Sequence, residues 1–134
     1  MYDTMKLAQE AILRRLSDNW TSTEIAWKNR DFKQEDAAFI RPRIIESGRG
    51  QRSLGSSGAR TFRTFGVFIV QVFSPTGEGQ EDILDLVDKL VTLFEGVQLT
   101  GALTFRGADS RDLGVDGKFT QYNVSFPFYY DTQK

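Results

Sequence analysis

The sequence predicts an α+β fold, in which an antiparallel or mixed β-sheet is packed by two α-helices. Residues 60–74 are apolar on both alternating faces, which is typical of a buried central strand. Residues 119–130 alternate between apolar and polar side chains, as a strand with one buried face does. Residues 4–18 and 80–95 instead place their apolar side chains at helical spacing. The predicted order of elements along the chain is α-β-β-β-α-β-β.

The length of 134 residues corresponds to one domain, which we expect to span residues 1–134. The chain is 40% hydrophobic and 26% charged, a composition that excludes a disordered protein. Residues 47–59 contain four glycines and four serines, and they predict a flexible Gly/Ser/Arg loop between two strands.

The first half of the chain begins with the predicted helix, whose apolar stripe comprises Leu7, Ala8, Ala11, Ile12 and Leu16. A short strand is predicted at 24–27, and Phe32 is expected to hold the next loop against the core. Residues 39–46 predict a second strand. Pro42 lies within it and has no amide hydrogen to donate, so this strand should lie at an edge or carry a bulge.

The second half continues with the strand at 60–74, which we expect to be covered on both faces. Gly66 within it indicates a bend or a close neighbour. The second helix presents the stripe Ile83, Val87, Leu90 and Phe94, and Gly96 stands where a glycine often ends a helix. Strands are predicted at 99–106 and 119–130, separated by a polar loop over 107–118. Pro127 indicates an edge or a point where pairing stops.

The absence of cysteine and histidine excludes several kinds of chemistry. Without them the chain has no disulfide, thiolate nucleophile, cysteine-based zinc site or histidine base. An enzyme built from the remaining residue types would need its own evidence, and no set of nucleophile, base and orienting side chain can be assembled, so we expect neither enzyme activity nor a metal site. The sequence also has neither an apolar run of about 18 residues nor a signal peptide, which predicts a protein made in the cytoplasm that does not enter a membrane.

An arginine-rich segment spans residues 41–64. Its six arginines are Arg41, Arg43, Arg49, Arg52, Arg60 and Arg63, and Glu46 is its one acid, so its net charge is +5 in a chain whose net charge is −1. Arginine binds phosphates and carboxylates through two parallel hydrogen bonds. Two interpretations of the segment stay open: a loop that faces phosphates or an acidic neighbour, and a solvated loop with charges flanking the strands.

An acidic segment follows over residues 78–95, and its acids include Glu81, Asp82, Asp85 and Asp88. Asp85 and Asp88 lack a third metal ligand, so the acids are predicted to lie on the wet face of the helix. Opposite charges on two surfaces would let copies of the chain meet head-to-tail. Two short helices should leave some apolar strand surface uncovered, which makes Phe39, Phe65 and Tyr129 candidates for a subunit interface.

The middle of the chain resembles the small minor tail proteins of long-tailed bacteriophages, a group that includes the tail terminators, also called tail completion or head–tail joining proteins. The resemblance rests on the order Ile25-Ala26-Trp27-x-Asn29, Phe32, Phe39-Ile40-Arg41-Pro42-Arg43, Arg60-Thr61-Phe62-Arg63 and Val70-Gln71-Val72-Phe73-Ser74-Pro75-x-Gly77-x-Gly79. Relatives usually carry a proline-rich segment where this chain has residues 33–38, so that loop is expected to differ in shape.

The resemblance implies an α+β subunit of a hexameric ring in the virion, at the head-proximal end of the tail, and it implies no enzyme activity and no cofactor. Such a ring stops polymerisation of the tail tube protein and offers its other face to the head connector or stopper protein. DNA passes through its lumen with non-specific contacts, and the arginines and acids named above are candidates for the subunit interface or the lumen. The alternative hypothesis is a small nucleic-acid-binding module that uses the arginine-rich loop.

Overall fold

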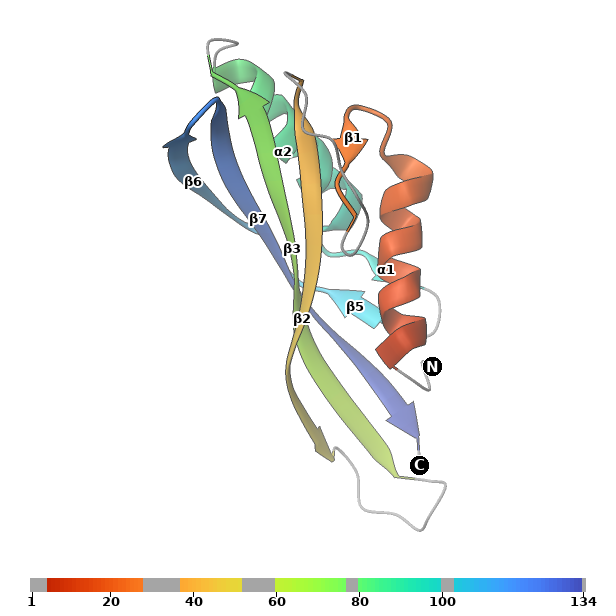
Figure 1. The fold of residues 1–134 in the computed structure, drawn as a ribbon. Helices are drawn as coiled ribbons and strands as arrows, with labels where there is room; N and C mark the ends of the chain where they lie inside the picture. The colour runs from red at the N-terminus through yellow and green to blue at the C-terminus, as the bar shows by residue number, and fades with distance from the viewer. Residues whose placement is uncertain (1–4, 28–36, 52–59, 77–79, 100–102, 134) are drawn as a thin grey trace.

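The computed structural model describes residues 5–27, 37–51, 60–76, 80–99 and 103–133 (Figure 1). Its elements are α1 (Met5–Asn19), β1 (Glu24–Ile25), β2 (Phe39–Gln51), β3 (Thr61–Pro75), α2 (Gln80–Phe94), β4 (Gln98–Leu99), β5 (Leu103–Phe105), β6 (Asp109–Asp116) and β7 (Phe119–Gln133). The α+β class and the predicted order α-β-β-β-α-β-β are confirmed, with two more strands after α2 than predicted. The expected position of Phe32 lies outside the described residues.

The strands form one mixed sheet in the order β1-β2-β3-β7-β5-β4, and β6 also pairs with β7. β1 runs parallel to β2, whereas all the other pairs are antiparallel. β3 lies at the centre and pairs with β7 along its whole length, from Thr61↔Gln133 to Pro75↔Phe119. The prediction of a central strand at 60–74 is therefore correct.

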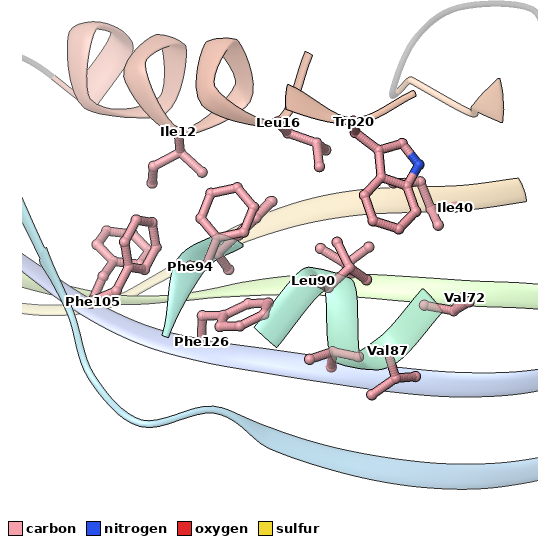
Figure 2. Close-up of a cluster of buried hydrophobic side chains, with 14 of the residues drawn as sticks. Ile12, Leu16, Trp20, Ile40, Val72, Val87, Leu90, Phe94, Phe105 and Phe126 are labelled. Carbon is pink, nitrogen blue, oxygen red and sulfur yellow. The ribbon is translucent and has the colours of Figure 1, made fainter. Parts of the chain in front are cut away.

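The core lies between the sheet and the two helices (Figure 2). Even-numbered residues of β3 and β7, such as Phe68 and Phe126, are fully buried on this side. Phe94, at the end of α2, packs against three rings of the sheet. Its ring centroid lies 5.0 Å from that of Phe68, 5.3 Å from that of Phe105 and 5.4 Å from that of Phe126. Burial of these aromatic rings, together with Ile83, Val87 and Leu90, holds α2 on the sheet.

The predicted α2 stripe is confirmed, whereas in the α1 stripe Ala11 is only half-buried and Leu7 is exposed. Ile83, Val87, Leu90 and Phe94 of α2 are all buried, as are Ala8, Ile12 and Leu16 of α1. Leu7 is 46% exposed, so its place in the α1 stripe was predicted wrongly. Leu7 lies near the start of α1, at the edge of the apolar arc, where the sheet does not cover it.

The opposite side of the sheet corrects a second prediction. Odd-numbered residues along the middle of β3 and β7 point away from the helices, and they are only half-buried where full burial was expected. The half-buried residues are Phe65, Val67, Ile69, Pro127 and Tyr129. At one end of these strands, Phe73 and Phe119 are buried in a small cluster with Ala26 and Phe39. No described helix packs on this side, which we call the open face. The apolar residues on both faces of β3 therefore indicate a second surface as well as a core.

Three predicted boundaries are also wrong. Residues 47–51 continue β2, because their backbone pairs with Phe62–Phe65 of β3 despite their loop-like composition. Residues 109–116, predicted as a polar loop, form β6 on the edge of β7, where polar side chains can stay in water. The strand predicted at 99–106 is divided into β4 and β5.

The glycines and prolines have the predicted roles. Gly96 has a φ angle of 69°, which suits the residue that ends α2. A Cβ atom on Gly66 would lie 2.5 Å from Phe128 Cζ, so Gly66 marks a close neighbour. Pro42 lies on an edge strand, which has a bulge between Glu46 and Gly48. Pro127 lies between the ends of the β6 and β5 ladders, where its carbonyl still accepts a hydrogen bond from the Arg106 amide at 2.7 Å.

Candidate interaction surface

A cluster of arginines and aromatic rings lies on the open face near the end of β7. Its members are Arg63, Phe65, Arg106, Tyr129 and Asp131, and we call it the arginine–aromatic cluster. The guanidinium of Arg63 lies 4.3 Å from the centre of the Tyr129 ring, and that of Arg106 lies 5.2 Å from it. Arg106 also lies 5.9 Å from the Phe65 ring. Such cation–π contacts hold the Phe65 and Tyr129 rings in position at the surface of the protein.

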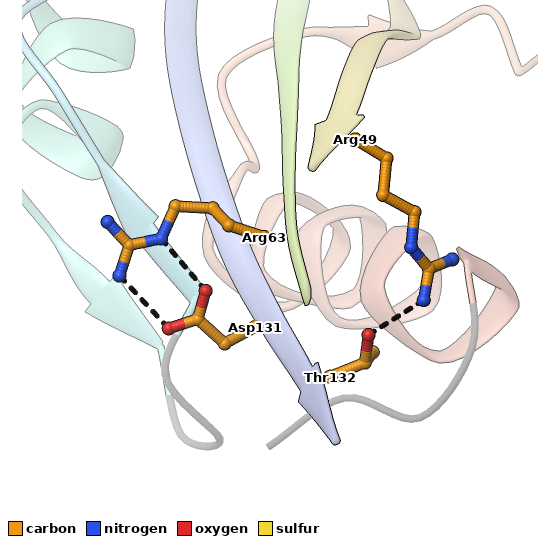
Figure 3. Close-up of polar contacts among 4 residues, drawn as sticks. All are labelled: Arg49, Arg63, Asp131 and Thr132. Carbon is orange, nitrogen blue, oxygen red and sulfur yellow. Dashed lines mark hydrogen bonds and ion pairs between the residues drawn. The ribbon is translucent and has the colours of Figure 1, made fainter. Parts of the chain in front are cut away.

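Asp131 holds Arg63 in place within this cluster (Figure 3). Arg63 Nε donates to Asp131 Oδ1 at 2.8 Å, and Arg63 Nη2 donates to Oδ2 at 3.0 Å. The hydrogen bond and the charge of Asp131 raise the pKa of Arg63 above its ordinary value, against a smaller opposing effect of burial. The sequence analysis missed Asp131 and Arg106. The register Arg63↔Asp131 between β3 and β7, which the sequence does not specify, creates the pair.

Arg41 and Arg43 lie on the same open face, on β2, and both are exposed. The guanidinium of Arg41 lies 5.5 Å from the Phe73 ring and 5.9 Å from the Phe39 ring. Phe39 is only 1% exposed and stacks on Phe73 with ring centroids 4.5 Å apart. We therefore exclude Phe39 from the accessible surface, whereas Phe65 and Tyr129 remain on it.

The remaining arginines do not share this surface. The bulge in β2 places Arg49 on the helix side, where its Nη2 donates to Thr132 Oγ1 at 2.8 Å and its guanidinium lies 5.7 Å from the Phe62 ring. Arg60 is exposed just before β3, and Arg52 lies outside the described residues. The arginine-rich segment is therefore divided between the two sides of the sheet.

The predicted acidic surface lies on the outer side of α2. Glu81, Asp82, Asp85 and Asp88 are all exposed, and Asp85 has Lys89 Nζ 3.9 Å away. Because α2 packs on the helix side of the sheet, these acids lie on the side opposite Arg41 and Arg43. Among the described residues, no group of three or more acidic side chains is placed to hold a metal ion. Neither described helix is long and apolar enough to cross a membrane.

Comparisons with known proteins bear on the whole chain. A family model described as "Phage tail terminator protein" matches residues 8–122. No curated protein matches. Among solved structures, one chain that is 21% identical aligns over 94% of this chain and 94% of its own length, with a TM-score of 0.72. At that identity the likeness shows a shared fold.

Proposed function

The chain belongs to the phage tail terminator family, and from this premise we propose that it forms a ring at the head-proximal end of the tail. The family is one of structural tail components without enzyme activity, as the absence of cysteine and histidine predicted. In the proposed role the ring stops growth of the tail tube, and its other face meets the head connector or stopper protein. A hexamer is the ring size that the resemblance implies.

The observation that best supports assembly is the open face of the sheet. Its half-buried apolar residues are accompanied by Ile45, which is 39% exposed. Apolar patches of this kind usually mark protein contacts. Tyrosine and arginine are also the residues that contribute most to binding in protein interfaces, and the arginine–aromatic cluster holds both in fixed positions. We assign Phe65 and Tyr129 to a contact made on assembly.

The charged surfaces support contact between different copies of the chain. Arg41 and Arg43 on the open face cannot reach the acids of α2 in the same chain, because the sheet lies between them. In a ring, a surface of one subunit meets a different surface of its neighbour, so opposite charges can pair between chains. We propose that Glu81, Asp82, Asp85 and Asp88 serve such a contact.

We propose that DNA passes through the lumen of this ring with weak, sequence-independent contacts to arginines. The described arginines do not form one continuous strip. Arg63 binds Asp131, Arg49 binds Thr132, and Arg41 stacks on Phe73. This division is why we do not propose a nucleic-acid-binding module.

Imaging of phage tails tests the proposed function. Tails assembled with the chain should show a ring at the head-proximal end, and tails assembled without it should keep growing and fail to join heads. Tyr129→Ala should weaken ring assembly while the subunit stays folded, whereas Gln98→Ala, an exposed change on β4 outside the proposed contacts, should not. Absence of the protein from the head-proximal end, or its presence there as a single copy, would contradict the proposal.

A further inference from the structure

Two strands of the sheet each have a long edge that no other described strand covers. β2 has β3 on one side, and on its other side β1 pairs only with Phe39 and Ile40. β6 pairs with β7 alone among the described strands. Uncovered edges of this kind are templates for pairing with another strand.

The backbone of β2 is oriented to accept such a strand. The amide of Ala26 donates to the carbonyl of Ile40 at 2.8 Å, so the backbone groups of Ile40 point away from β3. Successive residues of a strand alternate in this direction, so the groups of Pro42, Ile44 and Glu46 point to the same uncovered edge. Pro42 has no amide there to leave without a partner. Ile44 and Glu46 present both an amide and a carbonyl.

A groove of about 580 Å³ runs beside this edge, between β2 and α1. Its apolar lining residues are Leu13, Trp27, Pro42 and Ile44, and its polar ones are Gln9, Glu10, Arg14, Ser17, Asp18 and Arg43. A strand added to β2 would place every second side chain in this groove. A strand edge beside a helix-lined groove is an arrangement by which domains bind extended segments of other chains.

The uncovered edge of β6 complements this site in charge and in apolar character. β6 carries three aspartates and one arginine, a net charge of −2, while β2 carries three arginines and one glutamate, a net charge of +2. Leu113 and Val115 of β6 are 44% and 65% exposed, and they are two of the few large apolar side chains that the described residues leave so open.

We propose that β6 of a second copy of this chain pairs with the uncovered edge of β2, with Leu113 and Val115 of that copy contacting the groove beside α1. The proposal rests on the ring proposed above and names the strands that join its subunits. β2, β3, β7 and β6 are linked by three antiparallel pairings, so β6 runs antiparallel to β2. In a ring whose axis runs along the strands, rotation to the next subunit leaves the strand direction unchanged. The β6 strand of a neighbour would therefore also run antiparallel to β2 and could extend the sheet.

Two different edges meet in this contact, so it repeats from one subunit to the next and closes when the rotation completes a ring. The first test uses the wild-type chain, compared as isolated protein and in assembled tails by hydrogen exchange and mass spectrometry. We expect peptides covering 43–46 and 110–115 to exchange at least about tenfold more slowly after assembly. Residues 68–72 of β3 serve as the control, because both of their edges are already paired and their exchange should not change.

The second test uses the absence of natural cysteine to form a cross-link in assembled tails. Leu113→Cys is combined in turn with cysteine at each of positions 43–46, and oxidation should link neighbouring subunits for at least one pair. Leu84→Cys on α2 is the matched control, since Leu84 is 40% exposed, close to the exposure of Leu113. If the sheet is continuous between subunits it should not cross-link to β2, whereas a cross-link to position 43 would favour the charged contact between α2 and Arg43 over the edge pairing.

The outcomes separate this proposal from the proposed function. A ring that cross-links through Leu84→Cys and leaves 43–46 and 110–115 unprotected would overturn the edge pairing while the ring remains. Tails that contain no ring would overturn the proposed function itself. If the cysteine variants fail to assemble, the exchange measurement on the wild-type chain decides the matter.

Discussion

Gly66→Ala tests how tightly the centre of the sheet is packed. A Cβ atom at this position would lie 2.5 Å from Phe128 Cζ, 2.9 Å from Phe128 Cε1 and 2.8 Å from the carbonyl oxygen of Ile45. Phe128 is 2% exposed, so its ring has little room to move, and the carbonyl belongs to the backbone of the neighbouring strand. To make room for the Cβ atom, the Phe128 ring would have to move within the core, or the Ile45 carbonyl would have to move and disturb the β2–β3 pairing.

The expected magnitude follows from two opposing effects. Forcing an extra carbon into a packed core costs about 1–3 kcal/mol. Replacing glycine with alanine lowers the conformational entropy of the unfolded chain, which stabilises the folded state by about 0.4–1 kcal/mol. We therefore expect a net loss of about 1–2 kcal/mol in the free energy of unfolding. For a chain of this length that corresponds to a fall of about 4–7 °C in the melting temperature.

Urea unfolding followed by circular dichroism measures this change, with Gly48→Ala as the control. Gly48 also lies in the β2–β3 pairing, but a Cβ atom there would meet nothing within 4 Å, so this variant should be neutral or slightly more stable. Combining Gly66→Ala with Phe128→Leu should cost less than the sum of the two single changes, because the ring contact is removed. A Gly66→Ala chain as stable as the Gly48→Ala chain would refute the packing described for β3.

Two further predictions concern the core and a buried phenol. Leu90→Ala should lower the free energy of unfolding by about 2–5 kcal/mol, because Leu90 is fully buried under α2. Leu84→Ala on the exposed side should change it by less than about 0.5 kcal/mol, and equal effects would mean that the faces of α2 are reversed. Burial, with a hydrogen bond to Glu46, raises the pKa of Tyr130 above 10.0. The resulting stability is full below pH 10.0 and is lost as the pH rises through the raised pKa. Tyr130→Phe should therefore lose less stability than the wild type between about pH 8 and about pH 11, and parallel losses would contradict this assignment.

The sequence predicted those parts of the fold in which side-chain periodicity and burial agree. The stripe from Ile83 to Phe94 and the alternation from Tyr122 to Phe128 each describe one buried face, and both are confirmed. The sequence could not reveal β6, because an edge strand needs few apolar residues when most of its side chains remain in water. Residues 47–51 look like a loop for a similar reason: their backbone pairing with β3, rather than their side chains, makes them a strand.

The candidate surface was predictable only in part. Phe65 and Tyr129 were named because the apolar strand surface exceeded what two helices could cover, and both lie on the open face. Phe39 was named for the same reason, but it is enclosed by Phe73 and Phe119. Asp131 and Arg106 could not be found, since their roles depend on strand register. The bulge in β2, which also leaves no clear pattern in the sequence, moves Arg49 to the other side of the sheet.

Polar contacts on both sides of the sheet have a mechanical consequence at its far end. Arg63 binds Asp131 on the open face, and Arg49 binds Thr132 on the other side, so β2, β3 and β7 are linked across both surfaces within a few residues of their ends. Because the two links lie on opposite faces, curling the sheet about its strands toward one face should stretch the link on the other. The strand ends at Gln51 and Thr61 are therefore held in a fixed arrangement, which should resist deformation when a neighbouring molecule binds there.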